Sequence, residues 1–225
     1  IEIEWIQAED VEGLLAGGRL GHLDGMIIPG GFGERGIEGK IAAAHYAREN
    51  EIPCLGICLG LQVMVTEFCR NELGLVGANS REFDPTTAHP VVDLMDSQRD
   101  VTDMGGTMRL GVYPARLLEG TKAAAMYGEA LIYERHRHRY EVNNDYRAPM
   151  EEQGLRCSGL SPDGRLVEFI ELETHPFWVG TQAHPEFKSR PDRPAPLFQG
   201  LVEAALSRAE GRNPKLLESS AESVD

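Results

Sequence analysis

The chain has 225 residues, enough to bury the core of one large domain, and its 36 acidic against 22 basic side chains give a net charge of −14. This charge repels nucleic acid and anionic membranes, so neither is an expected partner. No apolar run approaches the roughly 18 residues needed to cross a bilayer, and the four cysteines have no metal-binding spacing. We therefore expect a soluble, cytoplasmic protein with reduced thiols.

The first half of the chain alternates short apolar runs with segments of helical period. Residues 1–6 alternate in polarity, which predicts a half-buried strand rather than a signal peptide. Strands are expected at residues 26–29 and 53–57, and helices at residues 37–50 and 59–73. This order is typical of a parallel sheet covered by helices, so we predict an α/β fold.

Extended segments dominate the second half. They are expected at residues 130–142, 155–161, 166–172 and 177–183. We therefore predict that a central, mostly parallel sheet continues into an antiparallel or mixed extension. A closing helix is predicted at residues 194–207, which makes residues 1–207 one domain, and residues 208–225 are predicted to be an acidic, disordered tail.

A glycine-rich run lies between the first predicted strand and helix. Residues 31–36 read GFGERG, the G-x-G-x-x-G pattern of a dinucleotide-binding turn. That site also needs an acid about 20 residues later, at the end of the second strand, but this strand ends in Cys58 and Glu51 precedes it. A P-loop is disfavoured as well, because Ile41 follows Lys40 where Ser or Thr should reach magnesium.

A candidate nucleophile follows the second predicted strand. Residues 56–60 read GICLG, the thiol version of the nucleophile elbow, in which a sharp strand-to-helix turn projects the nucleophile. The positive end of the following helix would stabilise the thiolate of Cys58. The alternative is that Cys58 is a buried core cysteine, which is our expectation for Cys54. A redox pair of these two thiols is disfavoured, because a strand does not hold them as a helical turn would.

A nucleophilic cysteine needs a base, and the base needs an orienting group. Three histidines precede prolines, which favours extended backbone at each: His89, His175 and His184. His184 alone is followed two residues later by an acid, Glu186. We therefore predict His184 as the base and Glu186 as the group that orients it; the alternative for His184 is a surface turn.

These motifs resemble a known family. The order of PGGFG, GICLG and HPE is that of class I glutamine amidotransferases. Over residues 25–205 the chain looks like the glutaminase domain of CTP synthases, on the runs GGFGERGIEGKIAAA, GANSREFDP, GGTMRLG, YERHRHRYEVNN, SGLSPDGRLVE and HPEFKSRP. The runs GGTMRLG and RHRHRYEVNN separate this branch from the GMP synthase, carbamoyl-phosphate and anthranilate branches.

The resemblance implies the class I glutamine amidotransferase fold and a Cys-His-Glu mechanism. Cys58 would attack the side-chain amide of L-glutamine, with His184 as acid and base and Glu186 fixing its ring. The backbone N–H groups of Gly31 and Leu59 would form the oxyanion hole. The glycine-rich run would then admit the substrate amide and hold no phosphate.

Substrate contacts are also implied. Strand periodicity places the arginines of residues 135–139 on one face and the histidines on the other. By resemblance, Arg139 would bind the α-carboxylate, while Gln62 and Glu82 would bind the α-ammonium group. The strand arginines could instead be solvated and Glu82 could be an ordinary loop carboxylate. The two histidines have no third ligand at suitable spacing, so we expect no metal.

The resemblance further implies a longer parent enzyme. In CTP synthases an N-terminal synthetase domain uses ATP and Mg²⁺ to aminate UTP to CTP, GTP is an allosteric activator, and the enzyme is a homotetramer. Arg109, in GGTMRLG, would contact GTP, and no cofactor is expected in this chain. The synthetase domain and the first strand and helix of the module are expected to be missing. The alternative is a truncated, weakly active module that serves as an assembly or GTP-regulatory surface.

Overall fold

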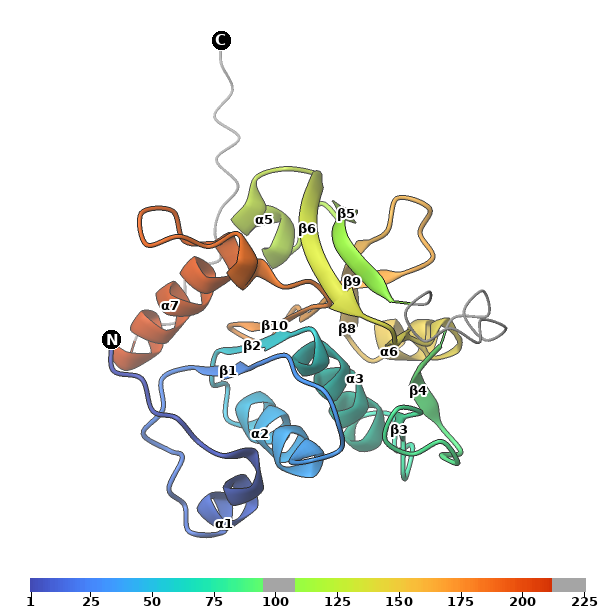
Figure 1. The fold of residues 1–225 in the computed structure, drawn as a ribbon. Helices are drawn as coiled ribbons and strands as arrows, with labels where there is room; N and C mark the ends of the chain where they lie inside the picture. The colour runs from blue at the N-terminus through green and yellow to red at the C-terminus, as the bar shows by residue number, and fades with distance from the viewer. Residues whose placement is uncertain (95–107, 212–225) are drawn as a thin grey trace.

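A seven-stranded mixed sheet forms the centre of the molecule (Figure 1), in the strand order β1-β2-β10-β9-β8-β5-β6. The computed structural model of the chain describes residues 1–94 and 108–211. The parallel strands are β1 (Met26–Ile28), β2 (Cys54–Ile57) and β10 (Trp178–Thr181). The antiparallel extension consists of β9 (Val167–Leu172), β8 (Leu155–Leu160), β5 (Arg109–Leu117) and β6 (Leu131–His138). The predicted α/β fold, with its change from parallel to antiparallel pairing, is confirmed.

Helices cover both faces of the parallel strands. Figure 1 shows α2 (Ile37–Glu49) and α3 (Leu59–Asn71) on one side, and α5 (Lys122–Tyr127) and α7 (Pro196–Ala209) on the other. All four residues of β2 are buried, because alternate side chains enter the two apolar clusters that these helix pairs form with the sheet. A short, fully apolar strand is what a doubly covered parallel sheet requires.

A smaller sheet lies beyond the end of α3. Its strands are β3 (Asn79–Ser80), β4 (Pro90–Asp93) and β7 (Glu141–Val142). The predicted strand at residues 130–142 is therefore two strands in different sheets, with Arg139 and Tyr140 between them. This break moves Arg139 off the strand face that it was expected to share with the other arginines. The alternation itself holds within β6, where both histidines are buried and Arg135 and Arg137 are exposed.

The remaining elements are short. They are η1 (Ala8–Asp10), α1 (Val11–Ala16), η2 (Asn144–Tyr146), α6 (Arg147–Glu152) and η3 (Pro185–Phe187). The closing helix α7 runs two residues beyond its predicted end. The predicted tail lies outside the described residues from residue 212 onward. Within the described residues, 1–94 and 108–211, no helix combines the length and apolar content that a bilayer span needs.

The predicted N-terminal strand is wrong. Residues 1–6 belong to no sheet of the described chain, and the side chains expected to be half buried are open to solvent, with Ile1, Ile3 and Trp5 exposed at 95%, 70% and 90%. Alternating polarity produces a strand only where a sheet edge supplies hydrogen-bond partners and an apolar surface covers one face. Neither is present at residues 1–6.

Candidate active site

Cys58 lies in the sharp turn between β2 and α3. Its backbone has φ 53° and ψ −104°, a strained conformation for a residue with a side chain. The Cys58 N–H donates to the Thr181 carbonyl at 2.7 Å, so the turn is held by the neighbouring strand β10. This is the geometry that the G-x-C-x-G spacing predicts for a projecting nucleophile.

His184 and Glu186 lie together just after β10. Nδ1 of His184 is 2.6 Å from Oε1 of Glu186, and the imidazole stacks on Phe187 with ring centroids 5.0 Å apart. The backbone N–H of His184 donates to the Arg135 carbonyl at 2.8 Å, which holds this turn against β6. The imidazole is therefore oriented by a carboxylate, a ring and a strand.

Gly30 shows how near the cysteine and the histidine are. A Cβ atom placed on Gly30 would lie 3.0 Å from Cε1 of His184 and 3.5 Å from Cβ of Cys58, so both side chains pack against this one glycine. Nε2 of His184 is buried and has no hydrogen-bond partner among the described residues. With Nδ1 bound to Glu186, Nε2 is the nitrogen left to exchange a proton with the thiol.

The charge state of His184 follows from its neighbours. Burial alone would favour the neutral ring, but contacts with Cys58 and Glu186 outweigh it and raise the pKa of His184 to about 9. The ring is then an imidazolium at neutral pH and can pair with a Cys58 thiolate. Burial raises the pKa of three further thiols to about 12, which disfavours their thiolate forms at neutral pH: Cys54, Cys69 and Cys157.

The backbone of β6 contacts the Cys58 sulfur and the backbone of His184. The Arg135 carbonyl accepts from the His184 N–H, and the Arg137 carbonyl lies 3.9 Å from Sγ of Cys58. Lys188 adds a side-chain clamp, since its Nζ donates to the Tyr133 carbonyl at 2.5 Å. Sequence reasoning missed these contacts, because they depend on which strand lies beside the turn.

The two predicted oxyanion-hole residues are neighbours. Gly31 follows β1 and Leu59 is the first residue of α3, so its N–H belongs to the unsatisfied first turn of that helix. A Cβ atom on Gly31 would lie 3.4 Å from Cδ2 of Leu59. Both backbone segments therefore border the Cys58 turn, where a tetrahedral oxygen would need its donors.

The three predicted substrate-binding side chains come from three different segments: Gln62 from α3, Glu82 from the loop after β3, and Arg139 from the link between β6 and β7. Gln62, on α3, donates through Nε2 to the Tyr140 carbonyl at 2.9 Å. Burial raises the pKa of Glu82, and the positive charge of Arg139 opposes this shift, which shows that the two side chains lie within electrostatic range. Burial also raises the pKa of Tyr140, the negative charge of Glu82 adds to this shift, and the positive charge of Arg139 opposes it. Tyr140 thus contacts Gln62 through its carbonyl, follows Arg139 in the chain, and is influenced by the charge of Glu82.

Arg109 lies in a buried ion-pair network rather than on the surface. Its guanidinium donates to Glu141 at 3.2 Å and to Glu168 at 2.7 Å, and it stacks over the Tyr113 ring at 4.6 Å. These contacts join β5 to β7 and β9. The contact between Arg109 and GTP that the sequence suggested stays a prediction.

The histidines of β6 form a second part of this network. Nδ1 of His136 and Nε2 of His138 are 2.9 Å apart, and Nδ1 of His138 faces the Tyr140 carbonyl at 3.2 Å. Because a carbonyl only accepts, His138 donates from Nδ1 and accepts from His136. Burial and the Arg109 charge lower the pKa values of these rings to about 2 and about 3, so both are neutral.

The other two candidate bases lie elsewhere. Nδ1 of His175 accepts from the Phe177 N–H at 3.1 Å, so Nε2 carries the proton and donates to the Ala47 carbonyl. Burial lowers the pKa of His175 to about 4. His89 packs edge-on against Tyr146. These contacts give His175 and His89 structural roles and leave His184 as the histidine beside Cys58.

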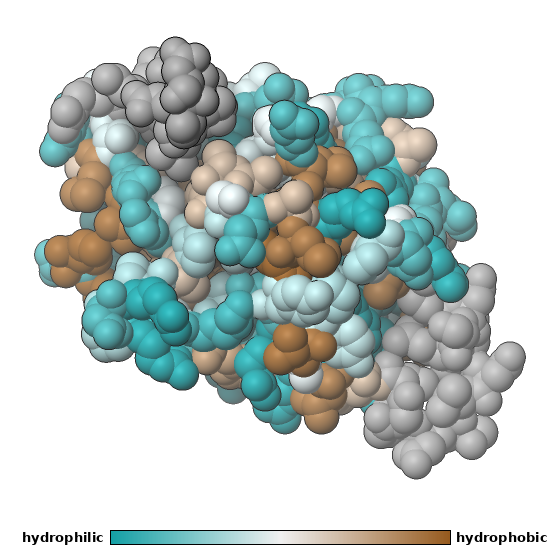
Figure 2. All heavy atoms as spheres, turned by 90° about the horizontal axis from the view of Figure 1, so that it is seen from above, coloured by the Kyte–Doolittle hydropathy of each residue, from teal (hydrophilic) through white to brown (hydrophobic). Residues whose placement is uncertain are grey.

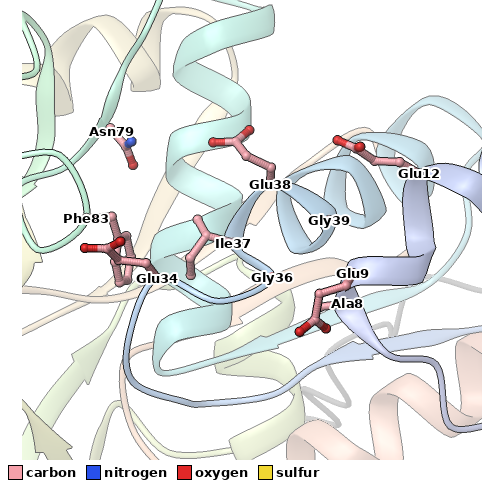
Figure 3. A pocket seen from close by; sticks show the side chains of 10 residues that line it. All are labelled: Ala8, Glu9, Glu12, Glu34, Gly36, Ile37, Glu38, Gly39, Asn79 and Phe83. Carbon is pink, nitrogen blue, oxygen red and sulfur yellow. The ribbon is translucent and has the colours of Figure 1, made fainter.

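A surface pocket of about 340 Å³ lies between the N-terminal segment and the start of α2 (Figure 3). It is lined by Ala8, Glu9, Glu12, Glu34, Gly36, Ile37, Glu38, Gly39, Asn79 and Phe83. Figure 3 shows carboxylates contributed from both sides of the pocket. It contains none of the predicted catalytic or substrate-binding residues, so it is separate from the candidate active site.

Comparisons with known proteins show the family of the chain. Residues 1–204 match the family model described as glutamine amidotransferase class-I. The chain is 57% identical over 209 residues to a CTP synthase of Bacillus subtilis, covering 93% of this chain and 39% of the relative. It is 59% identical over 207 residues to a CTP synthase of Caldanaerobacter subterraneus, covering 92% and 38%. The chain thus spans about two-fifths of the length of these relatives.

Solved structures agree as well. The glutaminase domain of Trypanosoma brucei CTPS, solved with bound acivicin, is similar with a TM-score of 0.86 and 40% identity, over 92% of this chain and 81% of that one. A Thermoplasma acidophilum protein, described as one of the subunits of a GMP synthase, has a TM-score of 0.56 at 17% identity, over 92% of both chains. This second likeness shows the fold alone.

The raised pKa of His184 predicts a pH effect on the thiol. Glu186→Gln removes one of the contacts that raise this pKa, so the imidazolium is lost at lower pH and pairs less well with the thiolate. Alkylation of Cys58 by iodoacetamide at pH 8 should therefore slow severalfold, as followed by peptide mass spectrometry.

Glu129→Gln, which removes an exposed carboxylate after α5, is the matched control and should leave the rate unchanged. Equal slowing in both variants, or alkylation of a cysteine other than Cys58, would contradict the assignment.

Proposed function

Because the chain belongs to the class I glutamine amidotransferase family, in the branch that forms the glutaminase domains of CTP synthases, we propose that it hydrolyses L-glutamine to glutamate and ammonia. The observation that carries the proposal is the strained Cys58 turn packed against the oriented His184–Glu186 pair. A thiol paired with a protonated imidazole is the nucleophile that an amide substrate requires.

The proposed reaction has two halves. The Cys58 thiolate attacks the amide carbon, and the carbonyl oxygen takes up the negative charge while the N–H groups of Gly31 and Leu59 donate to it. The imidazolium of His184 protonates the departing nitrogen, so ammonia leaves and a glutamyl thioester remains. The neutral ring then removes a proton from water, and the resulting hydroxide attacks the thioester carbon. The C–S bond breaks, which releases glutamate and restores the Cys58 thiolate. Each oxyanion donor contributes a factor on the order of 10² to 10³ in rate.

Substrate recognition can be assigned to three side chains. The Arg139 guanidinium suits the α-carboxylate, because its fork of N–H donors matches two oxygens. Glu82 supplies the opposite charge for the α-ammonium group. Both N–H groups of the Gln62 amide are used, by the Tyr140 carbonyl at 2.9 Å and by Oε1 of Gln182 at 3.2 Å. Oε1 of Gln62 is therefore the atom available to accept from the α-ammonium group.

We assign the ammonia to a synthetase domain of a longer, cytoplasmic polypeptide, since the chain spans two-fifths of its CTP synthase relatives. There, ATP with Mg²⁺ would drive amination of UTP to CTP in a homotetramer activated by GTP, with Arg109 near the effector. A module that only assembles or regulates has no supporting observation of its own.

A surface suited to that domain lies on the outer face of the antiparallel pair β5–β6. Leu110, Val112 and Tyr133 are 66%, 54% and 53% exposed and share this face with Arg135 and Arg137 through the strand register. Figure 2, which views Figure 1 from above, shows apolar patches among hydrophilic side chains on that side of the molecule. The carbonyls of the same arginines contact the catalytic pair, so a domain docked here would lie next to the site of ammonia release.

Ammonia release from glutamine tests the proposed function. Cys58→Ala should abolish release, because no other thiol can form the thioester, while Cys54→Ala should retain most of it. A glutamate dehydrogenase-coupled assay measures the glutamate product. Retained hydrolysis in Cys58→Ala would overturn the proposal.

Arg139 tests the substrate pocket. Arg139→Ala should weaken glutamine binding about ten- to a hundredfold, since the loss of a charge-assisted partner costs roughly 1.5 to 3 kcal/mol. The effect should fall mainly on KM, because the carboxylate is held equally in the ground and transition states. Arg139→Lys should recover only part of the loss.

Glutamine amide, which lacks the carboxylate, is the control substrate. If Arg139→Ala impairs turnover of this analogue as much as that of glutamine, Arg139 supports the loop between β6 and β7 and does not bind the substrate.

A further inference from the structure

Gln182 is a buried amide that the mechanism above does not use. Gln182 follows β10 directly and is completely buried. Its backbone N–H donates to the Glu168 carbonyl at 2.8 Å. A buried side-chain amide is costly unless its polar atoms find partners. Its partners here are Gln62 on one side and the Cys58 sulfur on the other.

The orientation of this amide follows from its neighbours. The Tyr140 carbonyl can only accept, so Gln62 must turn its Nε2 toward it. The second N–H of Gln62 donates to Oε1 of Gln182 at 3.2 Å. With its oxygen used in this way, Gln182 must present its own Nε2 to Sγ of Cys58, and these atoms are 3.9 Å apart.

We propose that Gln182 is a further catalytic residue, whose side-chain N–H donates a hydrogen bond to the Cys58 thiolate. The proposal rests on the proposed function only in taking Cys58 as the nucleophile. The 3.9 Å contact is long for a neutral thiol, but hydrogen bonds to an ionised acceptor are shorter and about twice as strong. The amide therefore stabilises the charged sulfur more than the protonated one.

The same amide connects the nucleophile to the substrate pocket. From Sγ the contacts run through Gln182 to Gln62, and from Gln62 to the carbonyl of Tyr140, beside Arg139. Gln182 thus supports the thiolate with one end of its amide and fixes the substrate-facing oxygen of Gln62 with the other.

The pH dependence of Cys58 alkylation by iodoacetamide, without glutamine, tests this role. Gln182→Met keeps a long unbranched side chain but lacks the donor, so alkylation at pH 7 should slow about tenfold and its midpoint should move to higher pH. Thr66→Val is the matched control. It removes the buried hydrogen bond that the Thr66 hydroxyl donates to the backbone carbonyl of Gln62 within α3, and it does not contact the sulfur. It should leave the pH profile unchanged.

An unchanged alkylation profile in folded Gln182→Met would overturn the proposal. If that variant does not fold, the wild-type protein provides the test, because the ¹⁵N-¹H signals of the Gln182 side-chain amide should shift as the thiolate forms. Absence of this shift would also overturn it. Both readouts work without glutamine turnover, so a failure here is distinguishable from a failure of the proposed glutaminase activity.

Discussion

The backbone turn at Cys58 is the constraint on which the rest of the site depends. A positive φ at a residue with a side chain is strained and persists only where the surrounding packing holds it. Here the packing admits no side chain on either flank: a Cβ on Gly60 would lie 2.1 Å from the Ile28 carbonyl, and one on Gly56 would lie 2.3 Å from Sδ of Met64. The close approach of α3 to the parallel strands thus requires both glycines and leaves the thiol as the projecting group.

The antiparallel half of the sheet supplies further contacts to the catalytic residues. Strand β6 places two carbonyls against Cys58 and His184. It reaches the buried charges around Arg109 through His136, whose Nε2 lies 3.7 Å from Oε2 of Glu168. Such a network is costly to form and still costlier to leave half satisfied, so it fixes one arrangement of the strands. We infer that stability of the antiparallel extension and alignment of the catalytic pair are linked.

Local sequence carries much of this architecture. The elbow, the His-Pro-Glu turn and the strand-helix alternation depend on neighbouring residues, so their spacing was sufficient to predict Cys58, His184 and Glu186 as one group. Strand β5 was missed, because Gly111 and Pro114 interrupt its pattern and one face is exposed. Gln182 was missed for another reason: its contacts arise from strand order, which no local pattern contains. Residues 1–6 show the opposite error, a strand pattern without a sheet edge beside it.

The protonation state of His184 in the resting protein tests the central claim, a protonated imidazole held between Glu186 and the Cys58 sulfur, most directly. ¹⁵N NMR of histidine-labelled protein reports it without substrate or turnover. We expect an imidazolium at pH 7 that loses its proton near pH 9, and a lower midpoint in Cys58→Ala, where the partner that helps to raise this pKa is gone. A neutral His184 ring at pH 7 in the wild-type protein, titrating like an ordinary exposed histidine, would contradict it.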